Sequence, residues 1–527
     1  MKYPIGIQSF ERMREDGFVY VDKTALVYDL VQNGSIYFLS RPRRFGKSLL
    51  VSVLENYFLG RRELFEGLEM ERLEKEWKCY PVFHVDFNLG NYRNIGSLEE
   101  ALDLSLRKWE RQYGVECEAQ DYGRRFCAIL EAAHAQTGLR CVVLVDEYDK
   151  PILDVMDTDA QTDVQGHSVL LETHNRELLR AFYSTFKSAD PHLKFVLLTG
   201  VTKFSQVSVF SGFNQPNDIS MNPKYDALCG ITEQELVEQF REPLQSMAAV
   251  YKCSVDEMLA LLKKHYNGYH FSEEMLGVIN PFSLLNALSA QRIRDYWFST
   301  GTPSYLIRLL RHFNENMDEL TSRYYEPQEF VDYKADVERP LPMIYQSGYL
   351  TIKDYKMRAN TFRLDYPNDE VKRGFVTLLA NNYLATRESV SSWMNEAVDA
   401  LEEGRLDDFR RQLTSFFASI PYSMRRKENE RERERYFHYT FYLLMRLAST
   451  YVTHTEQQSQ GRADCVIETD RHVYIFEFKL DSSASEALQQ IEAQGYARPY
   501  SNDSRQVHCI GVSFSSETGT VSNWAEK

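Results

Sequence analysis

The stretch IYFLSRPRRFGKSLLVSVLENYFL, residues 36–59, constrains the fold of this 527-residue chain more than any other. Its first four residues are apolar and predict a strand that is covered on both faces. Gly46-Lys47-Ser48 then opens a segment whose apolar residues recur at helical spacing. A strand, a tight loop and a helix N-terminus in this order make a phosphate cradle, in which backbone N–H groups, a lysine and an Mg²⁺-holding hydroxyl face the phosphates.

The loop departs from the usual phosphate-binding pattern. Arg41 stands where that pattern has a glycine, and the loop Arg41 to Arg44 is basic and contains a proline. The added charge either contributes contacts to a triphosphate, or the loop is narrowed and hydrolysis is slowed. The structural alternative is a chance Gly-Lys-Ser at the start of a helix, and a second motif argues against it.

That second motif is the buried run Cys141 to Val145, which ends in Asp146 and Glu147. Ligands of open α/β sheets bind at the carboxyl ends of the strands. Asp146 would hold the Mg²⁺ shell, and Glu147 would orient or deprotonate the attacking water. A solvent-facing acidic pair that closes a strand is the alternative. Together the two motifs favour binding of ATP and Mg²⁺.

A third strand, residues 193–198, ends at Thr199, which is the candidate sensor of the γ-phosphate, with Thr202 and Lys203 behind it. A turn or helix cap is the alternative role. Arg176 and Arg180 are candidates for a transition-state arginine, although surface ion pairing is the commoner role. The predicted nucleotide-binding residues are Arg44, Gly46, Lys47, Ser48, Asp146 and Thr199, with Ser48 and Asp146 on the metal and Glu147 catalytic.

Near the C-terminus, GRADCVIETDRHVYIFEFKL predicts a β-hairpin. A hairpin centred on Asp470-Arg471 places Asp464 opposite Glu477, and strand alternation puts Lys479 on the same face. Directly opposed carboxylates are destabilising without a cation, and Mg²⁺ fits. Lys479 would position or deprotonate a water. The alternative is a surface Glu-Phe-Lys strand with a cross-strand salt bridge.

Composition narrows the functional classes. The net charge of −15 excludes non-specific coating of nucleic acid, so any such binding is local and salt-sensitive. The eight cysteines show no metal-binding spacing and indicate reduced thiols. Because the N-terminus has no apolar signal region and no run has transmembrane length, we expect a cytoplasmic protein without a membrane partner.

On these residues the chain resembles a bacterial family that joins an AAA-ATPase-like domain to a C-terminal PD-(D/E)XK nuclease-like domain. The resemblance implies ATP binding, an AAA/ASCE-like P-loop core with a helical lid, and a restriction-endonuclease-like α/β domain. It also makes Glu456 a candidate acidic residue before the hairpin, and Gln490 and Tyr496 candidates on a flanking helix that is otherwise an ordinary amphipathic helix. The matching pieces include FVYVDKT (18–24), RPRRFGKSL (41–49), VLVDEYDKP (143–151), LLTGVTKFS (197–205), YWFSTGTPSYL (296–306), YQSGYLTI (345–352), GRAD (461–464), IFEFKL (475–480) and GVSFS (511–515).

Four regions are expected from these patterns: an ATPase-like core at 1–230, a helical lid at 231–335, a connecting region at 336–430 with a winged-helix-like element, and the nuclease-like domain at 431–527. Two functions stay open. One is an ATP-gated, Mg²⁺-dependent nuclease that cleaves nucleic acid, with DNA favoured, at Asp464, Glu477 and Lys479. The other is an ATP-driven switch whose nuclease-like domain binds without cleaving. AAA-type ATPases often form homo-oligomers, but no residue here indicates one.

Overall fold

The computed structural model describes residues 1–117, 119, 121–156, 158–164, 166–203, 216–299, 305–306, 317–331, 340–384, 390–419, 444 and 465–527. They form two compact units, Met1–Val371 and Lys372–Lys527. None of the described helices has both the length and the hydropathy needed to cross a lipid bilayer.

The first unit is built on a parallel sheet with strand order β2-β3-β6-β1-β7. The sheet is buried on both faces, since every residue of β3 and all but one of β6 are buried. The strand β6 separates the strand of the phosphate-binding loop from the strand that ends in the acidic pair. The strands are β1 (Ile36–Ser40), β2 (Val82–Asp86), β3 (Cys141–Asp146), β6 (Leu193–Gly200) and β7 (Asn217–Asp218).

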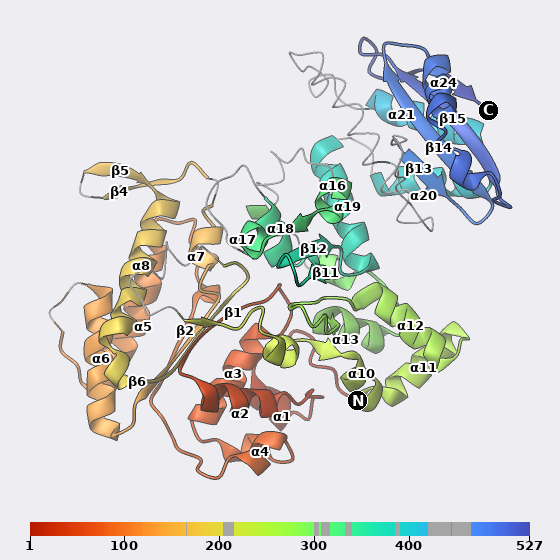
Figure 1. Cartoon of the computed structure of the whole chain (residues 1–527). Coiled ribbons are helices and arrows are strands. Elements are labelled where there is room, and N and C mark those ends of the chain that lie inside the picture. The colour runs from red at the N-terminus through yellow and green to blue at the C-terminus, as the bar shows by residue number, and fades with distance from the viewer. Residues whose placement is uncertain are drawn as a thin grey trace. The chain divides into compact units, whose positions relative to one another are not determined.

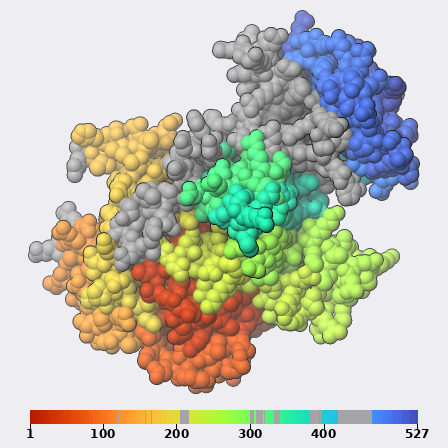
Figure 2. All heavy atoms as spheres, in the orientation of Figure 1, coloured from red at the N-terminus to blue at the C-terminus, as the bar shows by residue number. Residues whose placement is uncertain are grey.

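Helices cover both faces of this sheet, with α5, α6 and α8 on one side and α1 to α4 on the other (Figure 1). Between β3 and α8, the hairpin of β4 (Gln161–Val164) and β5 (His167–Leu170) projects from the body of the unit (Figures 1 and 2). The helices are α1 (Phe10–Glu15), α2 (Thr24–Asn33), α3 (Lys47–Phe58), α4 (Glu69–Leu73), α5 (Ser97–Tyr113), α6 (Tyr122–Thr137), α7 (Lys150–Leu153) and α8 (Leu171–Ser188).

A group of helices follows the sheet and shares an apolar core of its own. Two of them begin with capping boxes, Thr232 with Glu235 and Ser254 with Glu257, which satisfy the first free N–H groups. Tyr3 packs against this core from the N-terminal segment. The elements are β8 (Ile231–Thr232), α10 (Glu233–Gln239), α11 (Arg241–Tyr251), α12 (Val255–Tyr266), β9 (Val278–Ile279), α13 (Pro281–Ala290) and α14 (Tyr296–Ser299).

The rest of the first unit contains a hairpin that pairs β11 with β12, where the sequence predicts two strands at 349–355 and 361–366. A third strand, β10, was not predicted and lies on the other side of β12. The elements are α16 (Met317–Ser322), β10 (Tyr324–Tyr325), α17 (Pro327–Val331), α18 (Leu341–Gln346), β11 (Thr351–Lys356), β12 (Thr361–Asp365) and α19 (Asp369–Leu384). The boundary between the two units, after Val371, falls within α19. The region boundaries expected from the sequence, and the winged-helix-like element, stay predictions.

The second unit is a four-stranded mixed sheet with the order β13-β14-β15-β16. Helix α24 packs on one face, while α21 contacts the other through Phe409 and Phe417. The sequence also predicts a charged, solvated helix at 425–435 and an apolar helix at 436–449; both lie outside the described residues apart from Leu444. The elements are α20 (Val390–Glu402), α21 (Leu406–Ser419), β13 (Cys465–Glu468), β14 (His472–Leu480), α24 (Ala484–Gln494), β15 (Gln506–Phe514) and β16 (Val521–Glu526).

Candidate functional site

The phosphate-binding loop leads directly into a helix N-terminus. Gly46 has a left-handed backbone with φ of 96°, and α3 begins at the next residue without a side-chain cap. A Cβ added to Gly46 would meet no heavy atom within 4 Å, so the backbone here is open to a ligand. The first N–H groups of α3 and the positive end of its dipole therefore make an anion site.

The Lys47 side chain is buried and its ammonium is surrounded by oxygen atoms. It donates to the carbonyl oxygens of Arg41 at 3.1 Å and of Pro42 at 3.3 Å. It also lies 3.6 Å from Glu147 Oε1. The lysine of the loop and the acidic pair that follows β3 therefore meet at one edge of the sheet.

Asp146 is buried and shares its Oδ1 atom between two donors. The Thr199 hydroxyl donates to it at 2.6 Å, and the Glu147 N–H at 3.1 Å. In the sheet register Asp86, at the end of β2, is the neighbour of Asp146. Asp86 was not singled out from the sequence, although its place at the end of PVFHVD, a strand of the same sheet, was the available signal.

The residues at this edge fit a magnesium ion in their chemistry. Ser48 is partly exposed, and its hydroxyl forms no hydrogen bond with another described residue. Hydroxyl and carboxylate oxygens are the hard donors that Mg²⁺ prefers, usually with several waters retained. Ser48 and Asp146 would hold the ion, and this assignment stays a prediction.

A cleft of about 520 Å³ opens over the loop. The cleft is lined by Gly46, Lys47, Ser48 and Glu147 and by both exposed arginines of the loop, Arg43 and Arg44. Further lining residues come from the N-terminal segment, α7 and α13, namely Pro4, Gln8, Lys150, Asp154, Pro281, Phe282 and Leu285.

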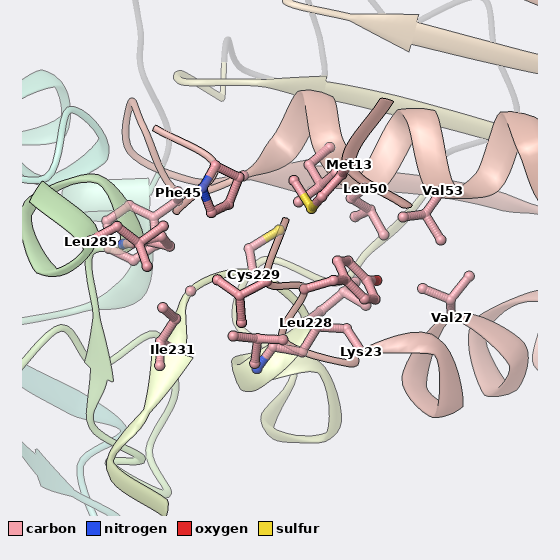
Figure 3. Close-up of a pocket in the computed structure, with 18 of the residues that line it drawn as sticks. Met13, Lys23, Val27, Phe45, Leu50, Val53, Leu228, Cys229, Ile231 and Leu285 are labelled. Atoms are coloured by element: carbon pink, nitrogen blue, oxygen red, sulfur yellow. The ribbon is translucent and has the colours of Figure 1, made fainter. Parts of the chain in front are cut away.

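Beside the cleft lies a smaller apolar pocket of about 90 Å³. Figure 3 shows Met13, Leu50 and Val53 on one side of it and Leu228 and Cys229 on the other. The pocket and the cleft share lining residues at the start of α3 and on α13, so the two cavities are adjacent. The shared residues are Pro4, Met13, Gly46, Leu49, Pro281 and Leu285.

One polar pair stands at the apolar pocket. Lys23, which lines it, forms an ion pair with Glu235 of α10, with Nζ–Oε distances of 2.5 and 2.6 Å. Burial lowers the pKa of Lys23, while Glu235 opposes that shift. The pair ties the N-terminal segment to the helical lid at the mouth of the pocket.

Arg41 does not reach the cleft. Its guanidinium is buried, donates to the carbonyl oxygens of Ser220 at 2.7 Å and Tyr225 at 3.2 Å, and lies 3.9 Å from the centre of the Phe271 ring. The residue that replaces the usual glycine is thus a structural anchor, and the extra charge that the sequence assigned to the loop reaches the cleft only through Arg43 and Arg44.

Asp149 holds the turn after β3 against the turn after β6. Its Oδ2 accepts hydrogen bonds from Val201 N, Thr202 N and the Thr202 hydroxyl at 2.6–3.0 Å. Burial, with a contribution from Glu147, raises the pKa of Asp149 to about 7. Thr202 therefore supports the acidic loop, and sequence reasoning missed Asp149 because a third carboxylate in DEYD reads as solvent-exposed.

In the second unit, the described pairs of the hairpin keep the predicted register, from Cys465 opposite Phe476 to Glu468 opposite Val473. Glu477 is buried, and Lys479 Nζ donates to Gln490 Oε1 of α24 at 2.6 Å. Asp464 and Glu456 lie outside the described residues.

The two faces of β14 are divided as the alternation predicted. Val473 and Ile475, on the Glu477 face, pack against Ile491 and Tyr496 next to α24. Phe476 and Phe478, on the other face, pack against rings of α21, β15 and β16. Tyr496 is thus part of an apolar core, whereas Gln490 reaches the charged end of the strand.

Two family models match this chain. One, described as a predicted AAA-ATPase, covers residues 4–210, and the other, of the PD-(D/E)XK nuclease superfamily, covers residues 432–524. An "Uncharacterized protein in vnfD 5'region" of Azotobacter chroococcum mcd 1 is 36% identical over 530 residues, which cover 99% of this chain and 98% of that protein. The chain belongs to this AAA-ATPase-like family with a C-terminal PD-(D/E)XK domain. Its fold class is that predicted, a P-loop core with a helical lid and a restriction-endonuclease-like α/β domain.

In this AAA-ATPase-like protein, one glycine explains how α24 comes close to the nuclease-like strands. Gly511 is the neighbour of Glu477 in the parallel pair of β14 and β15. A Cβ at Gly511 would lie 2.1 Å from the carbonyl oxygen of Ala484. Only glycine therefore lets the first turn of α24 approach the sheet beside Glu477.

The two arginines of α8 are engaged in ion pairs on their own helix. Arg176 pairs with Glu172, and Arg180 lies 3.5 Å from Glu177. Arg180 is exposed, which agrees with the surface role that the sequence offered as the alternative to a transition-state arginine, whereas the Arg176 side chain is only 21% exposed. Among the residues that the structure describes, no cluster of three or more His, Cys, Asp or Glu side chains is arranged to hold a metal.

Proposed function

We propose that the first unit binds and hydrolyses ATP with Mg²⁺, and that the second cleaves nucleic acid phosphodiesters with Mg²⁺, under the control of the nucleotide. The observation that carries the proposal is the meeting of Lys47 with Glu147 beneath an open cleft at the N-terminus of α3. The family membership supports nucleotide and divalent metal use in general terms.

In the ATP complex that we propose, the phosphates lie on the N–H groups that follow Gly46, and the base enters the apolar pocket. Lys47 turns from Glu147 to the β- and γ-phosphate oxygens. Ser48 and Asp146 hold Mg²⁺, which neutralises phosphate charge when bound. Glu147 then orients the attacking water, and Arg44 contributes positive charge to phosphate binding. Thr199 senses the γ-phosphate through its hydrogen bond to Asp146.

In the second unit, we propose Asp464 and Glu477 as the Mg²⁺ ligands and Lys479 as the group that positions the attacking water. The acidic pair follows from extending the described hairpin register by one residue pair. The burial of the Glu477 carboxylate within β14 supports such an ion, because a divalent cation offsets the cost of burying the charge. DNA is the favoured substrate, and we place the protein in the cytoplasm.

A second candidate function is an ATP-driven switch whose nuclease-like unit binds nucleic acid without cleaving it. The contact of Lys479 with Gln490 favours it, because an ammonium held by a side-chain amide has fewer donors left for a water or a phosphate. The net charge of −15 also disfavours a broad nucleic-acid surface.

One assay separates the two functions: Mg²⁺-dependent cleavage of single- and double-stranded DNA and RNA, with and without ATP. Under the nuclease proposal, Lys479→Ala abolishes cleavage and leaves ATP hydrolysis intact, while Lys47→Ala abolishes hydrolysis and the effect of ATP on cleavage. Lys78→Ala and Lys527→Ala, at exposed lysines of the two units, are the matched controls. Absence of cleavage by the wild type, together with ATP-dependent binding of DNA, would favour the switch.

A further inference from the structure

Three arginines of the phosphate-binding loop lie in three different environments. Arg41 is buried against backbone carbonyls and Phe271. The Arg44 guanidinium stands 5.3 Å from the centre of the Phe282 ring, on the lid side of the cleft. Arg43 is exposed and lines the same cleft, together with Lys47 and Glu147.

The backbone that carries Arg43 is fixed from the far side of the loop. The indole N–H of Trp297 donates to the Arg43 carbonyl oxygen at 3.1 Å. Pro42 packs so closely against Gly348 that a Cβ on that glycine would lie 2.6 Å from it. The Arg43 side chain therefore projects into the cleft from a main chain that is held in place.

Neither arginine that lines the cleft has a carboxylate partner among the residues that the structure describes, and of the two only Arg44 lies against an aromatic ring, so Arg43 is the one left without a described side-chain partner. Lys47 faces Glu147 at 3.6 Å, and Lys150 lies 2.8 Å from Asp154. Lys203 pairs with Asp218, and the α8 arginines pair with glutamates of their own helix. An unpaired cation in a cleft can accept added negative charge without first giving up an ion pair.

Resting on the ATP hydrolysis proposed above, we infer that Arg43 is the transition-state arginine of this ATPase and that the phosphate-binding loop supplies it within the same chain. In the reaction, a water oxygen bonds to the γ-phosphorus as the bond to the β,γ-bridging oxygen breaks. The electron pair stays on the ADP oxygen, and the water proton passes to Glu147 and then to solvent. Arg43 neutralises charge on the γ-phosphoryl oxygens during this transfer.

This role has two measurable consequences. Loss of an arginine that acts on the transition state lowers kcat, by roughly 10³-fold or more in known cases, while ground-state binding changes little. Because the arginine comes from the same chain, the rate per chain does not depend on protein concentration, as it would if a neighbouring copy supplied the residue.

The test compares the full-length wild type with Arg43→Ala, Arg43→Lys and Arg44→Ala. Three quantities are measured for each: steady-state kcat and KM for ATP, the Kd of a non-hydrolysable ATP analogue, and the Kd of MgADP with aluminium fluoride, a mimic of the transition state. We expect Arg43→Ala to lower kcat at least about 100-fold, to weaken aluminium fluoride binding to a similar degree, and to change the analogue Kd less than about 3-fold. Arg43→Lys should restore part of kcat, and Arg44→Ala should mainly raise KM. Arg180→Ala, on the surface of α8, is the control that leaves all three values unchanged.

Several outcomes overturn the inference. One is an Arg43→Ala variant that hydrolyses ATP like the wild type. Another is a variant that loses analogue binding as strongly as kcat, which makes Arg43 a binding residue. A third is a wild-type rate per chain that falls on dilution, which assigns the arginine to a second copy. A wild type that binds the analogue but never hydrolyses ATP refutes the proposed hydrolysis itself, and so is distinguishable from failure at Arg43.

Discussion

Each unit has an acid and a lysine beside or within an apolar strand of its sheet, but the partner of the lysine differs. In the first unit Lys47 faces a carboxylate, Glu147. In the second, Lys479 is held by the neutral amide of Gln490, and no described carboxylate lies within ion-pair distance of it. A ligand of the first site must therefore separate an ion pair, whereas a ligand of the second must only displace or share an amide.

The units also differ in how they treat other carboxylates. In the first unit, burial raises the pKa of Asp149 to about 7, of Asp226 to about 6 and of Glu370 to about 7. In the second unit, hydrogen bonds from Arg505 lower the pKa of Asp503 to about 2. The three acids of the first unit are buried, whereas Asp503 is partly exposed and pairs with Arg505. The contrast holds for these acids and not for the units as wholes, because the second unit also buries Glu468 and Glu477.

The largest effect is expected from neutralising the acid in each site. Glu147→Gln should lower the kcat of ATP hydrolysis by about 10²–10⁴-fold, because the water loses its base, and should tighten ATP binding, because Lys47 is freed from its ion pair. Glu477→Gln should abolish Mg²⁺-dependent cleavage without tightening the binding of nucleic acid. Kinetics and equilibrium binding with both ligands measure the contrast.

Glu76→Gln and Glu486→Gln, at acids outside both sites, serve as controls for this pair of variants. The comparison fails if Glu147→Gln weakens ATP binding, since the Lys47 ion pair would then not compete with the phosphates. The comparison also fails if Glu477→Gln tightens nucleic-acid binding as much as Glu147→Gln tightens ATP binding, since the lysines of the two sites would then be paired in the same way.

The next effect concerns pH. Glu370 is buried, accepts a hydrogen bond from Trp297 N at 2.6 Å, and has a pKa of about 7, against an ordinary value of 4.5. Between these values the folded chain holds a proton that the unfolded chain has lost, so the free energy of unfolding falls as pH rises. The full difference corresponds to about 3 kcal/mol. The Glu370→Gln variant cannot ionise at this position. Its free energy of unfolding, measured by urea denaturation, should therefore not show this decrease between pH 4.5 and pH 8.

Asp369→Asn is the matched control, because its carboxylate is 41% exposed at the start of the same helix. It should keep the wild-type dependence on pH. A Glu370→Gln variant that loses stability with pH as steeply as the wild type would assign the dependence to other groups.

The strands and the hairpin register could be predicted because they depend on local alternation. In β14 the apolar residues and the turn at Asp470-Arg471 fix which residues pair, and the described pairs follow that register. The strand β16 was missed because the apolar residues of VSNWAE do not alternate with polar ones, and because the strand joins the sheet at its edge through backbone pairing with β15. An edge strand of this kind leaves little signal in hydrophobic periodicity.

The environment of the site could not be predicted where it depends on distant segments. A basic loop reads as exposed, yet Arg41 is buried by carbonyl groups of residues 220 and 225 and by the ring of Phe271. The proximity of Lys47 to Glu147 follows from the strand order, which brings the carboxyl ends of β1 and β3 to one edge on either side of β6. Local patterns therefore indicate candidate reactive residues but not the residues that hold them in place.

A smaller effect is expected at Thr199, whose hydroxyl donates to Asp146 within the buried sheet edge. Thr199→Val keeps the volume but leaves Asp146 without this donor, and Thr199→Ser restores it. A hydrogen bond to a charged group contributes about 1.5–3 kcal/mol, so kcat should fall by roughly 10- to 100-fold in the valine variant and recover in the serine variant. Equal loss in both variants would show that packing, and not the hydroxyl, matters.

The smallest effect should come from Gln490, which tests whether the amide contact restrains or serves Lys479. If Gln490 orients the ammonium toward a water, Gln490→Ala should lower cleavage by about 10-fold, because an oriented charge-assisted hydrogen bond contributes about 1.5 kcal/mol or more. Gln489→Ala, on the exposed side of the same helix, is the control. If the amide instead holds Lys479 away from the substrate, as in a binding module, Gln490→Ala should raise cleavage or tighten DNA binding. The sign of this change decides whether the neutral partner of Lys479 belongs to an active site or to an inactive one.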